Sequence, residues 1–309
     1  MPAAGAGADP SRIERLAVRY VPGRGPVAIG RLGSGLVNRS YRVARDGREY
    51  SLRAAAPRDN AIGLGLDRAW ECRVLRRAAR AGLAPHVERC EPRAGVLVAR
   101  WVEGSCWSTR DASSVGVIEK VALLARRVHA LPPMPRPRIV SAAQWIDFYR
   151  REIDGHGDET ARGPRDSGLR DIDRRARSLL ESLTREPAPA GALCHGDLHV
   201  QNLVIVPGGD PVILDWEYAH VADPWWDLAG WACNGDLTPD RRDLLLGFYL
   251  GRAPAAGETA RLARLAWLYD YVCLLWCELY PISRSSAGEP VQVVSARAGQ
   301  LAERLRRCP

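Results

Sequence analysis

The sequence predicts an α/β (α+β) fold of two lobes, in which a small β-rich N-terminal lobe precedes a larger helical C-terminal lobe. The chain has 309 residues, of which 46% are hydrophobic, enough for a sizeable core. Residues 27–52 alternate in the manner of strands. Beyond Gly104 the periodicity changes to that of helices. We therefore divide the chain into lobes over residues 11–103 and 104–309.

The N-terminal lobe is expected to contain strands, a helix and further strands. Residues 1–10 are small and polar and are expected to be disordered. The elements expected after them are a helix over 11–20, strands over 27–29, 40–43 and 50–52, a helix over 66–81, and strands over 86–90 and 96–102. Asp46-Gly47 predicts a tight turn between the second and third strands, and Gly82 closes the second helix.

The C-terminal lobe is expected to be helical apart from one hairpin. The expected helices cover residues 113–131, 142–153, 171–185 and several segments from 224 to the end, including 265–281. The hairpin pairs residues 203–206 with 212–214 across a turn at 207–210.

Charge, cysteine content and hydrophobicity favour a soluble cytoplasmic protein that does not bind nucleic acid. The net charge is +8, but the arginines alternate with acids and Lys120 is the only lysine, which argues against nucleic acid as a partner. A steep salt-dependent affinity for nonspecific DNA would instead support a nucleic-acid-binding protein. The eight cysteines show no C-x-x-C pair and are expected to be free, mostly buried thiols in a reducing compartment. Neither a signal peptide nor a membrane-spanning run is expected.

The strongest functional signal is the segment His195-Gly196-Asp197 with Asn202, followed after the hairpin by Asp215. Phosphoryl transfer needs a carboxylate that takes the proton of the attacking hydroxyl and oxygen ligands for Mg²⁺. Asp197 supplies the first, and Asn202 and Asp215 supply the second. Either motif alone is also compatible with a capped turn or a buried strand end. Their combination predicts catalytic chemistry.

This pattern, H-G-D-x-x-x-x-N followed by a hairpin and D-W-E-Y-A, resembles the family of aminoglycoside phosphotransferases, choline kinases and thiamine kinases. The resemblance covers nearly the whole chain, including 123–129, Asp223-Pro224 and 227–229. It implies a two-lobed protein-kinase-like fold and transfer of the γ-phosphate of ATP, with Mg²⁺, to a hydroxyl of a small and usually cationic substrate.

The resemblance also implies the residues that hold ATP. They are the glycine-rich segment Gly33-Ser34-Gly35, Arg53 of the third strand with Glu71 of the helix as its ion-pair partner, and the connection at Trp101 and Val102 against which adenine is expected to lie. Glycines at a hairpin tip let backbone N–H groups approach phosphate. The alternatives are an ordinary hairpin turn, a solvated edge charge at Arg53 and an exposed helix residue at Glu71.

Two residues are expected to support the catalytic loop without taking part in the chemistry. Asp227 can accept backbone N–H bonds from the loop that carries His195 and Asp197, and His195 itself is expected to support that loop. The remaining histidines considered, His86, His156, His199 and His220, are interpreted as ordinary surface or core residues.

The substrate residues are predicted from the helix over 265–281 and from Glu217. At 3.6 residues per turn, Asp270 and Glu278 share a face with Trp267 and Tyr271, whereas Trp276 points the other way. These acids and rings could bind an amine by charge and cation–π contact; the alternative is a core helix whose acids pair with arginines. D-W-E-Y-A and the W-x-E at 276–278 most resemble bacterial thiamine and choline kinases. The rival functions are phosphorylation of an aminoglycoside-type antibiotic and a catalytically inactive nucleotide-binding protein.

Overall fold

The computed structural model describes residues 10–34, 38–55, 65–156, 167–187, 189–282 and 289–307. The chain forms two compact units. The first comprises residues 1–59, 67–105 and 204–214, and the second comprises residues 60–66, 106–203 and 215–309. The predicted boundary after residue 103 assigns the hairpin at 204–214 to the helical half, but the hairpin belongs to the first unit. The reason is tertiary: Ile213 N–H donates to the Leu83 carbonyl, at 2.8 Å.

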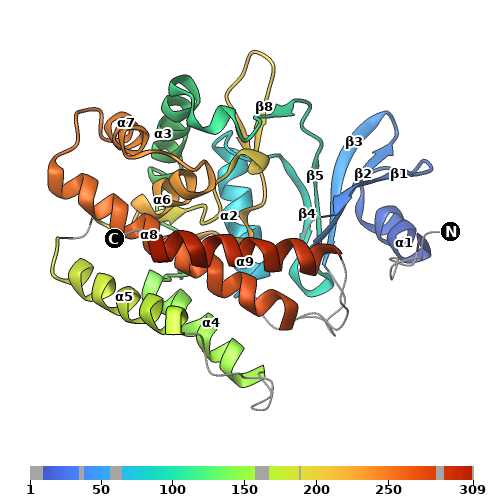
Figure 1. Cartoon of the computed structure of the whole chain (residues 1–309). Coiled ribbons are helices and arrows are strands. Elements are labelled where there is room, and N and C mark those ends of the chain that lie inside the picture. Colours follow the sequence, from blue (N-terminus) through green and yellow to red (C-terminus); the bar gives the residue numbers. More distant parts are fainter. Residues whose placement is uncertain are drawn as a thin grey trace. The chain divides into compact units, whose positions relative to one another are not determined.

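An antiparallel five-stranded sheet forms the centre of the first unit (Figure 1). Its order is β1 (Ala28–Ser34), β2 (Asn38–Arg45), β3 (Arg48–Ala55), β5 (Val96–Arg100) and β4 (Val87–Glu91). Asp46 and Gly47 connect β2 to β3 with φ angles of 49° and 70°, as a tight hairpin turn requires. The predicted strands are therefore present, and β1, β2 and β3 extend beyond their predicted ends.

One face of this sheet is covered by α1 (Pro10–Tyr20), which begins at the last residue of the segment expected to be disordered; residues 1–9 lie outside the described part. Ile13 and Ala17 of α1 are buried against the sheet. The cluster also contains Val21, Tyr41, Val43, Tyr50, Leu52, Ala54, Val96 and Val98. The inward residues of β2 and β3 alternate along each strand, which explains why the sequence pattern predicted them.

The second helix of this unit is α2 (Arg68–Arg80). Asp67 caps its N-terminus, and the Asp67 side chain accepts from Trp70 N–H at 2.9 Å. A disulfide joins Cys72 of α2 to Cys90 of β4. The expectation of free thiols is thus wrong for this pair, because their 18-residue separation carries no recognisable spacing and only the fold brings them together. The other described cysteines are free, and Cys308 lies outside the described residues.

Helices dominate the second unit, as the sequence predicts. They are α3 (Val115–His129), α4 (Ala142–His156), α5 (Ser167–Thr184), α6 (Trp225–Asn234), α7 (Pro239–Leu250), α8 (Ala256–Ile282) and α9 (Glu289–Arg307). The long helix α8 packs against α4, α6 and α9 and carries buried residues on all sides. It begins nine residues before the predicted start at 265. None of the helices in the described ranges is long and apolar enough to cross a membrane.

Short strands frame the functional segments. β7 (Ala192–Cys194) pairs antiparallel with β10 (His220–Ala222), and neither was predicted because three residues carry almost no periodicity. A further sheet has the order β6 (Ser105–Cys106), β8 (Leu203–Ile205) and β9 (Val212–Ile213). β8 and β9 are the predicted hairpin, slightly shortened.

Candidate active site

The segment that follows β7 is held by the carboxylate of Asp227, which lies in the first turn of α6. One carboxylate oxygen accepts from His195 N–H and the other from Gly196 N–H, each at 2.8 Å. These are the hydrogen bonds expected for Asp227. A charged acceptor with two backbone donors is a strong restraint on the loop, and both residues that donate are immediately before Asp197.

Asp227 is in turn held by His129 at the end of α3. His129 Nε2 lies 3.1 Å from Asp227 Oδ2, and its Nδ1 lies 2.9 Å from the hydroxyl of Tyr249. Burial alone would raise the pKa of Asp227, but the hydrogen bond and charge of His129, with His195 and the Gly196 N–H, lower it below its ordinary value. Asp227 is therefore ionised and able to accept. The sequence indicates His129 only as part of the segment 123–129, because nothing in its local sequence predicts this contact.

Gly196 has a conformation that other residues would not tolerate. Its φ is 84°, and a Cβ at this position would lie 2.6 Å from the carbonyl oxygen of Tyr218. Both the torsion and the close backbone approach require glycine here. The turn at Gly196 directs the chain so that Asp197 follows it.

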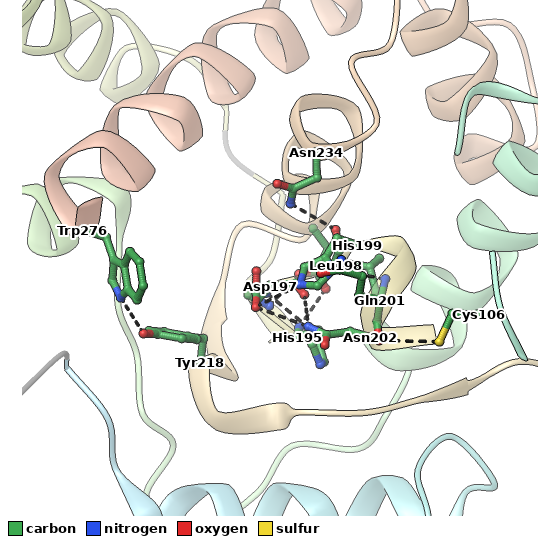
Figure 2. Close-up of polar contacts among 12 residues, drawn as sticks. Cys106, His195, Asp197, Leu198, His199, Gln201, Asn202, Tyr218, Asn234 and Trp276 are labelled. Atoms are coloured by element: carbon green, nitrogen blue, oxygen red, sulfur yellow. Dashed lines mark hydrogen bonds and ion pairs between the residues drawn. The ribbon is translucent and has the colours of Figure 1, made fainter. Parts of the chain in front are cut away.

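Figure 2 shows Asp197 surrounded by polar groups from its own loop. Asn202 Nδ2 donates to the Asp197 carbonyl at 2.9 Å and lies 3.3 Å from its carboxylate. His199 Nε2 is 3.4 Å from the same carboxylate. Burial acts to raise the pKa of Asp197, but His199, His195 and Arg297 together lower it below its ordinary value. The carboxylate is thus ionised. His199, interpreted from the sequence as an ordinary residue, is one of its neighbours.

The two predicted metal ligands leave the β8–β9 hairpin at the same end. Asn202 ends a 3₁₀ turn (Val200–Asn202) just before β8, and Asp215 follows β9 by two residues. Since the donor nitrogen of Asn202 faces Asp197, its amide oxygen is the atom able to hold a cation. Asp215 is exposed and has φ 55°, an uncommon left-handed conformation that is often found at functional sites. Amide and carboxylate oxygens are hard ligands of the kind that suit Mg²⁺.

In the first unit, Arg53 and Glu71 form the predicted ion pair, with Arg53 Nη2 2.5 Å from Glu71 Oε1. Glu71 is buried, and its second oxygen pairs with Arg68 at 2.9 Å. Arg68 also donates to the Asn38 side chain at 2.8 Å. Burial of Glu71 between two cations rules out the alternative of an exposed helix residue. Arg68 was not predicted, although its position three residues before Glu71 is a recognised spacing for helix ion pairs.

The other residues predicted to bind the nucleotide lie at the end of β1 and directly after β5. Gly33 and Ser34 form the end of β1, whereas Gly35 lies outside the described residues. Trp101 and Val102 follow β5, and both are half-buried. Trp101 N–H donates to the carbonyl of Glu49 in β3, at 3.0 Å. This hydrogen bond fixes the start of the segment after β5.

The predicted substrate residues have different surroundings in the structure. Asp270 is buried and paired with Arg304 of α9, the arrangement given as the alternative. Glu217 is also buried, and Glu278 is half-buried. The indole N–H of Trp276 donates to the hydroxyl of Tyr218, the residue after Glu217, at 2.7 Å (Figure 2).

An aromatic cluster that the sequence did not predict surrounds Tyr218. Trp145 and Tyr149 of α4 stack with ring centroids 5.5 Å apart, and the Trp145 ring lies 6.2 Å from that of Tyr218. Burial, then Tyr149, Glu217 and Asp197, raise the pKa of Tyr218 well above its ordinary value, so its hydroxyl stays neutral. These rings come from distant segments, so no sequence spacing could reveal them.

Comparison with known proteins identifies the family. The family model described as APH, phosphotransferase enzyme family, matches residues 28–265. Among curated proteins, an aminoglycoside 3'-phosphotransferase of Escherichia coli is 28% identical over 144 residues, or 43% of this chain and 49% of the relative. The chain thus matches about half the length of that relative.

Solved structures match over almost the whole chain. A choline/ethanolamine kinase family protein from Mesorhizobium loti has a TM-score of 0.76 at 24% identity, covering 97% of this chain and 95% of the other. Choline kinase LicA from Streptococcus pneumoniae has a TM-score of 0.75 at 18% identity, covering 95% and 98%; LicA has also been solved in complex with AMP. At these identities the matches show the fold, a mixed α+β kinase-like architecture. Together with the match over residues 28–265, they show that the chain belongs to the APH phosphotransferase enzyme family.

Proposed function

We propose that this phosphotransferase moves the γ-phosphate of ATP, with Mg²⁺, to the hydroxyl group of an amino or quaternary-ammonium alcohol of the thiamine or choline type. The observation that carries the proposal is the loop after β7, where an ionised Asp197 is fixed by its neighbours. In this role Asp197 takes the proton of the acceptor hydroxyl as the phosphoryl group is transferred. We propose the cytoplasm, where ATP is abundant, as the place of this reaction.

Mg²⁺ and ATP would be held by the residues predicted for them. Asn202 Oδ1 and the Asp215 carboxylate would hold Mg²⁺, which neutralises charge on the phosphates when it is bound. Arg53, fixed by Glu71, would hold a phosphate oxygen, with the backbone of Gly33, Ser34 and Gly35 as further donors. Adenine would lie against Trp101 and Val102. The AMP complex of LicA supports a nucleotide as the donor.

The acceptor side of the proposal uses the aromatic cluster. Arg138 already lies 5.0 Å from the Trp145 ring centroid, and Tyr280 stacks on Trp276 with ring centroids 5.1 Å apart. An ammonium group would therefore lie over Tyr218 or over the face of Trp276 away from Tyr280. A cation over such a ring gains ~0.5–2 kcal/mol. Glu217, buried beside Tyr218 in the 3₁₀ turn Trp216–Tyr218, adds negative charge.

The competing proposal is phosphorylation of an aminoglycoside, supported by the curated relative from Escherichia coli. A polycationic antibiotic calls for several available acids. Of the acids predicted for substrate, Asp270 is already paired with Arg304, which favours a smaller ammonium compound. An inactive nucleotide-binding protein is disfavoured because Asp197, Asn202 and Asp215 are all retained.

The experiment that tests the acceptor is ADP release from Mg-ATP across thiamine, choline, ethanolamine, homoserine and kanamycin. We expect turnover with at least one of the four ammonium alcohols and little with kanamycin. A preference for kanamycin would replace the proposal with its competitor. ATP binding without turnover on any acceptor tested would count against the proposed acceptor class.

Arg53→Ala is expected to raise the KM for ATP and lower kcat, because a charge-assisted contact to phosphate is lost. Such contacts contribute about 1.5–3 kcal/mol, which corresponds to roughly 10- to 100-fold in kcat/KM. Arg53→Lys should retain part of both, since an ammonium still reaches phosphate as a point charge. Steady-state kinetics with varied ATP measure the effect. Unchanged ATP kinetics in Arg53→Ala would show that another cation binds the phosphate, and Arg68 would be the first to test.

A further inference from the structure

An arginine of the C-terminal helix reaches the catalytic loop. Arg297 of α9 donates through Nη2 to the side-chain oxygen of Asn234, at 3.1 Å. Asn234, the last residue of α6, donates in turn toward the carbonyl oxygen of Leu198 at 3.5 Å and the hydroxyl of Tyr269 at 3.3 Å. Figure 2 shows the contact between Asn234 and Leu198, the residue that follows Asp197. The guanidinium group is therefore anchored beside the loop that carries the proposed base.

Within the part of the chain that the structure describes, Arg297 forms no salt bridge. Elsewhere on α9, Arg304 pairs with Asp270 and Arg307 with Glu303. No carboxylate of the described residues lies within salt-bridge distance of Arg297. Its anchoring partner, Asn234, is a neutral amide. The donors that Asn234 does not occupy are consequently available to a ligand.

The hydrogen bonds through Asn234 place this cation beside the loop that carries Asp197. Burial would lower the pKa of Arg297, but Cys273, Cys277, Tyr269 and Asp197 together raise it above its ordinary value. A hydroxyl compound bound at Asp197 would therefore have one cation beside the same loop.

We propose that Arg297 determines specificity by binding a carboxylate on the acceptor, so that the preferred substrate is a zwitterion carrying hydroxyl, ammonium and carboxylate groups. This inference rests on the proposed function and narrows its acceptor class. A guanidinium presents a planar set of donors that matches a carboxylate, often with two parallel hydrogen bonds. The ammonium group would lie against Tyr218 and Trp276, and the carboxylate against Arg297. A purely cationic alcohol would leave the arginine unpaired and would be repelled by it.

Two pairs of compounds that differ only in the carboxylate test the proposal. Serine is ethanolamine with a carboxylate, and homoserine is 3-aminopropan-1-ol with a carboxylate. We expect the wild-type protein to have a higher kcat/KM for the carboxylate-bearing member of at least one pair. Arg297→Gln should reduce that preference by about 10- to 100-fold, with Arg297→Lys intermediate. Arg307→Gln removes the same charge from the same helix at an exposed surface pair and should leave the preference intact.

A second measurement separates failure of this inference from failure of the proposed function. Dissociation constants for both pairs are measured by calorimetry with a non-hydrolysable ATP analogue, on wild type and Arg297→Gln. If binding prefers the carboxylate-bearing member and Arg297→Gln loses this preference, the inference is supported even when no turnover is seen. The lack of turnover would then overturn only the proposed reaction. Turnover with equal or better use of the carboxylate-free members overturns the inference and leaves the proposed function standing. An equal loss on both members of each pair in Arg297→Gln also overturns it, because a merely structural role would weaken both alike.

Discussion

Asp197→Asn is expected to give a folded protein that still binds ATP and turns over about 10²–10⁴-fold more slowly. Asparagine nearly matches aspartate in size, and the 2.9 Å bond from Asn202 goes to the backbone carbonyl, which the substitution keeps. The two hydrogen bonds from the loop to Asp227 also remain. What is lost is the carboxylate that takes the proton. Because acceptor binding survives, the loss should appear in kcat more than in KM.

Steady-state kinetics with the best acceptor and calorimetric ATP affinity measure these two effects separately. His199→Gln is an informative companion, since it removes a neighbour of the carboxylate without removing the carboxylate itself. A wild-type kcat in Asp197→Asn would show that Asp197 is not the base. Loss of both ATP binding and the folded state would show that Asp197 has a structural role instead.

Asp215→Ala is expected to abolish phosphoryl transfer by removing a carboxylate ligand of Mg²⁺, whose contribution to charge stabilisation is several kcal/mol, or about 10³-fold or more in rate. Asn202→Ala should impair Mg²⁺ dependence less completely, because it removes a neutral ligand. Raising the Mg²⁺ concentration should therefore restore part of the activity in Asn202→Ala and little in Asp215→Ala. Kinetics against Mg²⁺ concentration provide the measurement.

The left-handed backbone of Asp215 requires a control for strain, since alanine is less tolerant of φ 55°. Asp215→Asn keeps a residue type that adopts this conformation and removes only the negative charge. Thermal unfolding of both variants separates the backbone effect from the ligand effect. Near-normal turnover of Asp215→Ala at ordinary Mg²⁺ levels would contradict the metal assignment.

The sequence predicts those features of this fold that are local. Asp46-Gly47 indicates its turn by itself, and the alternation along β2 and β3 indicates which residues face the core. The loop from His195 to Asn202 is recognisable because the spacing of its residues is set by one continuous segment. The ion pair of Arg53 with Glu71 is predictable only by resemblance, as it joins a strand to a helix.

Features that depend on distant segments meeting are not predictable in this way. His129 reaches Asp227 across 98 residues, and Trp276 reaches Tyr218 across 58. Asp270 has a helical spacing that suits a ligand-binding face, yet the partner that decides its surroundings, Arg304, comes from another helix. Periodicity predicts which residues share a face of a helix. It does not predict which other segments that face contacts.

The disulfide between α2 and β4 makes the stability of the first unit depend on its surroundings. The bond closes a loop between residues 18 apart. In the chain-entropy account, a loop of about this length raises the free energy of unfolding by about 3 kcal/mol, because it restricts the unfolded chain. Where glutathione keeps thiols reduced, that contribution disappears for the unit that carries Arg53 and Glu71, while the helical unit, whose described cysteines are free, loses nothing. The same polypeptide would then differ between compartments in which of its two units unfolds first on warming.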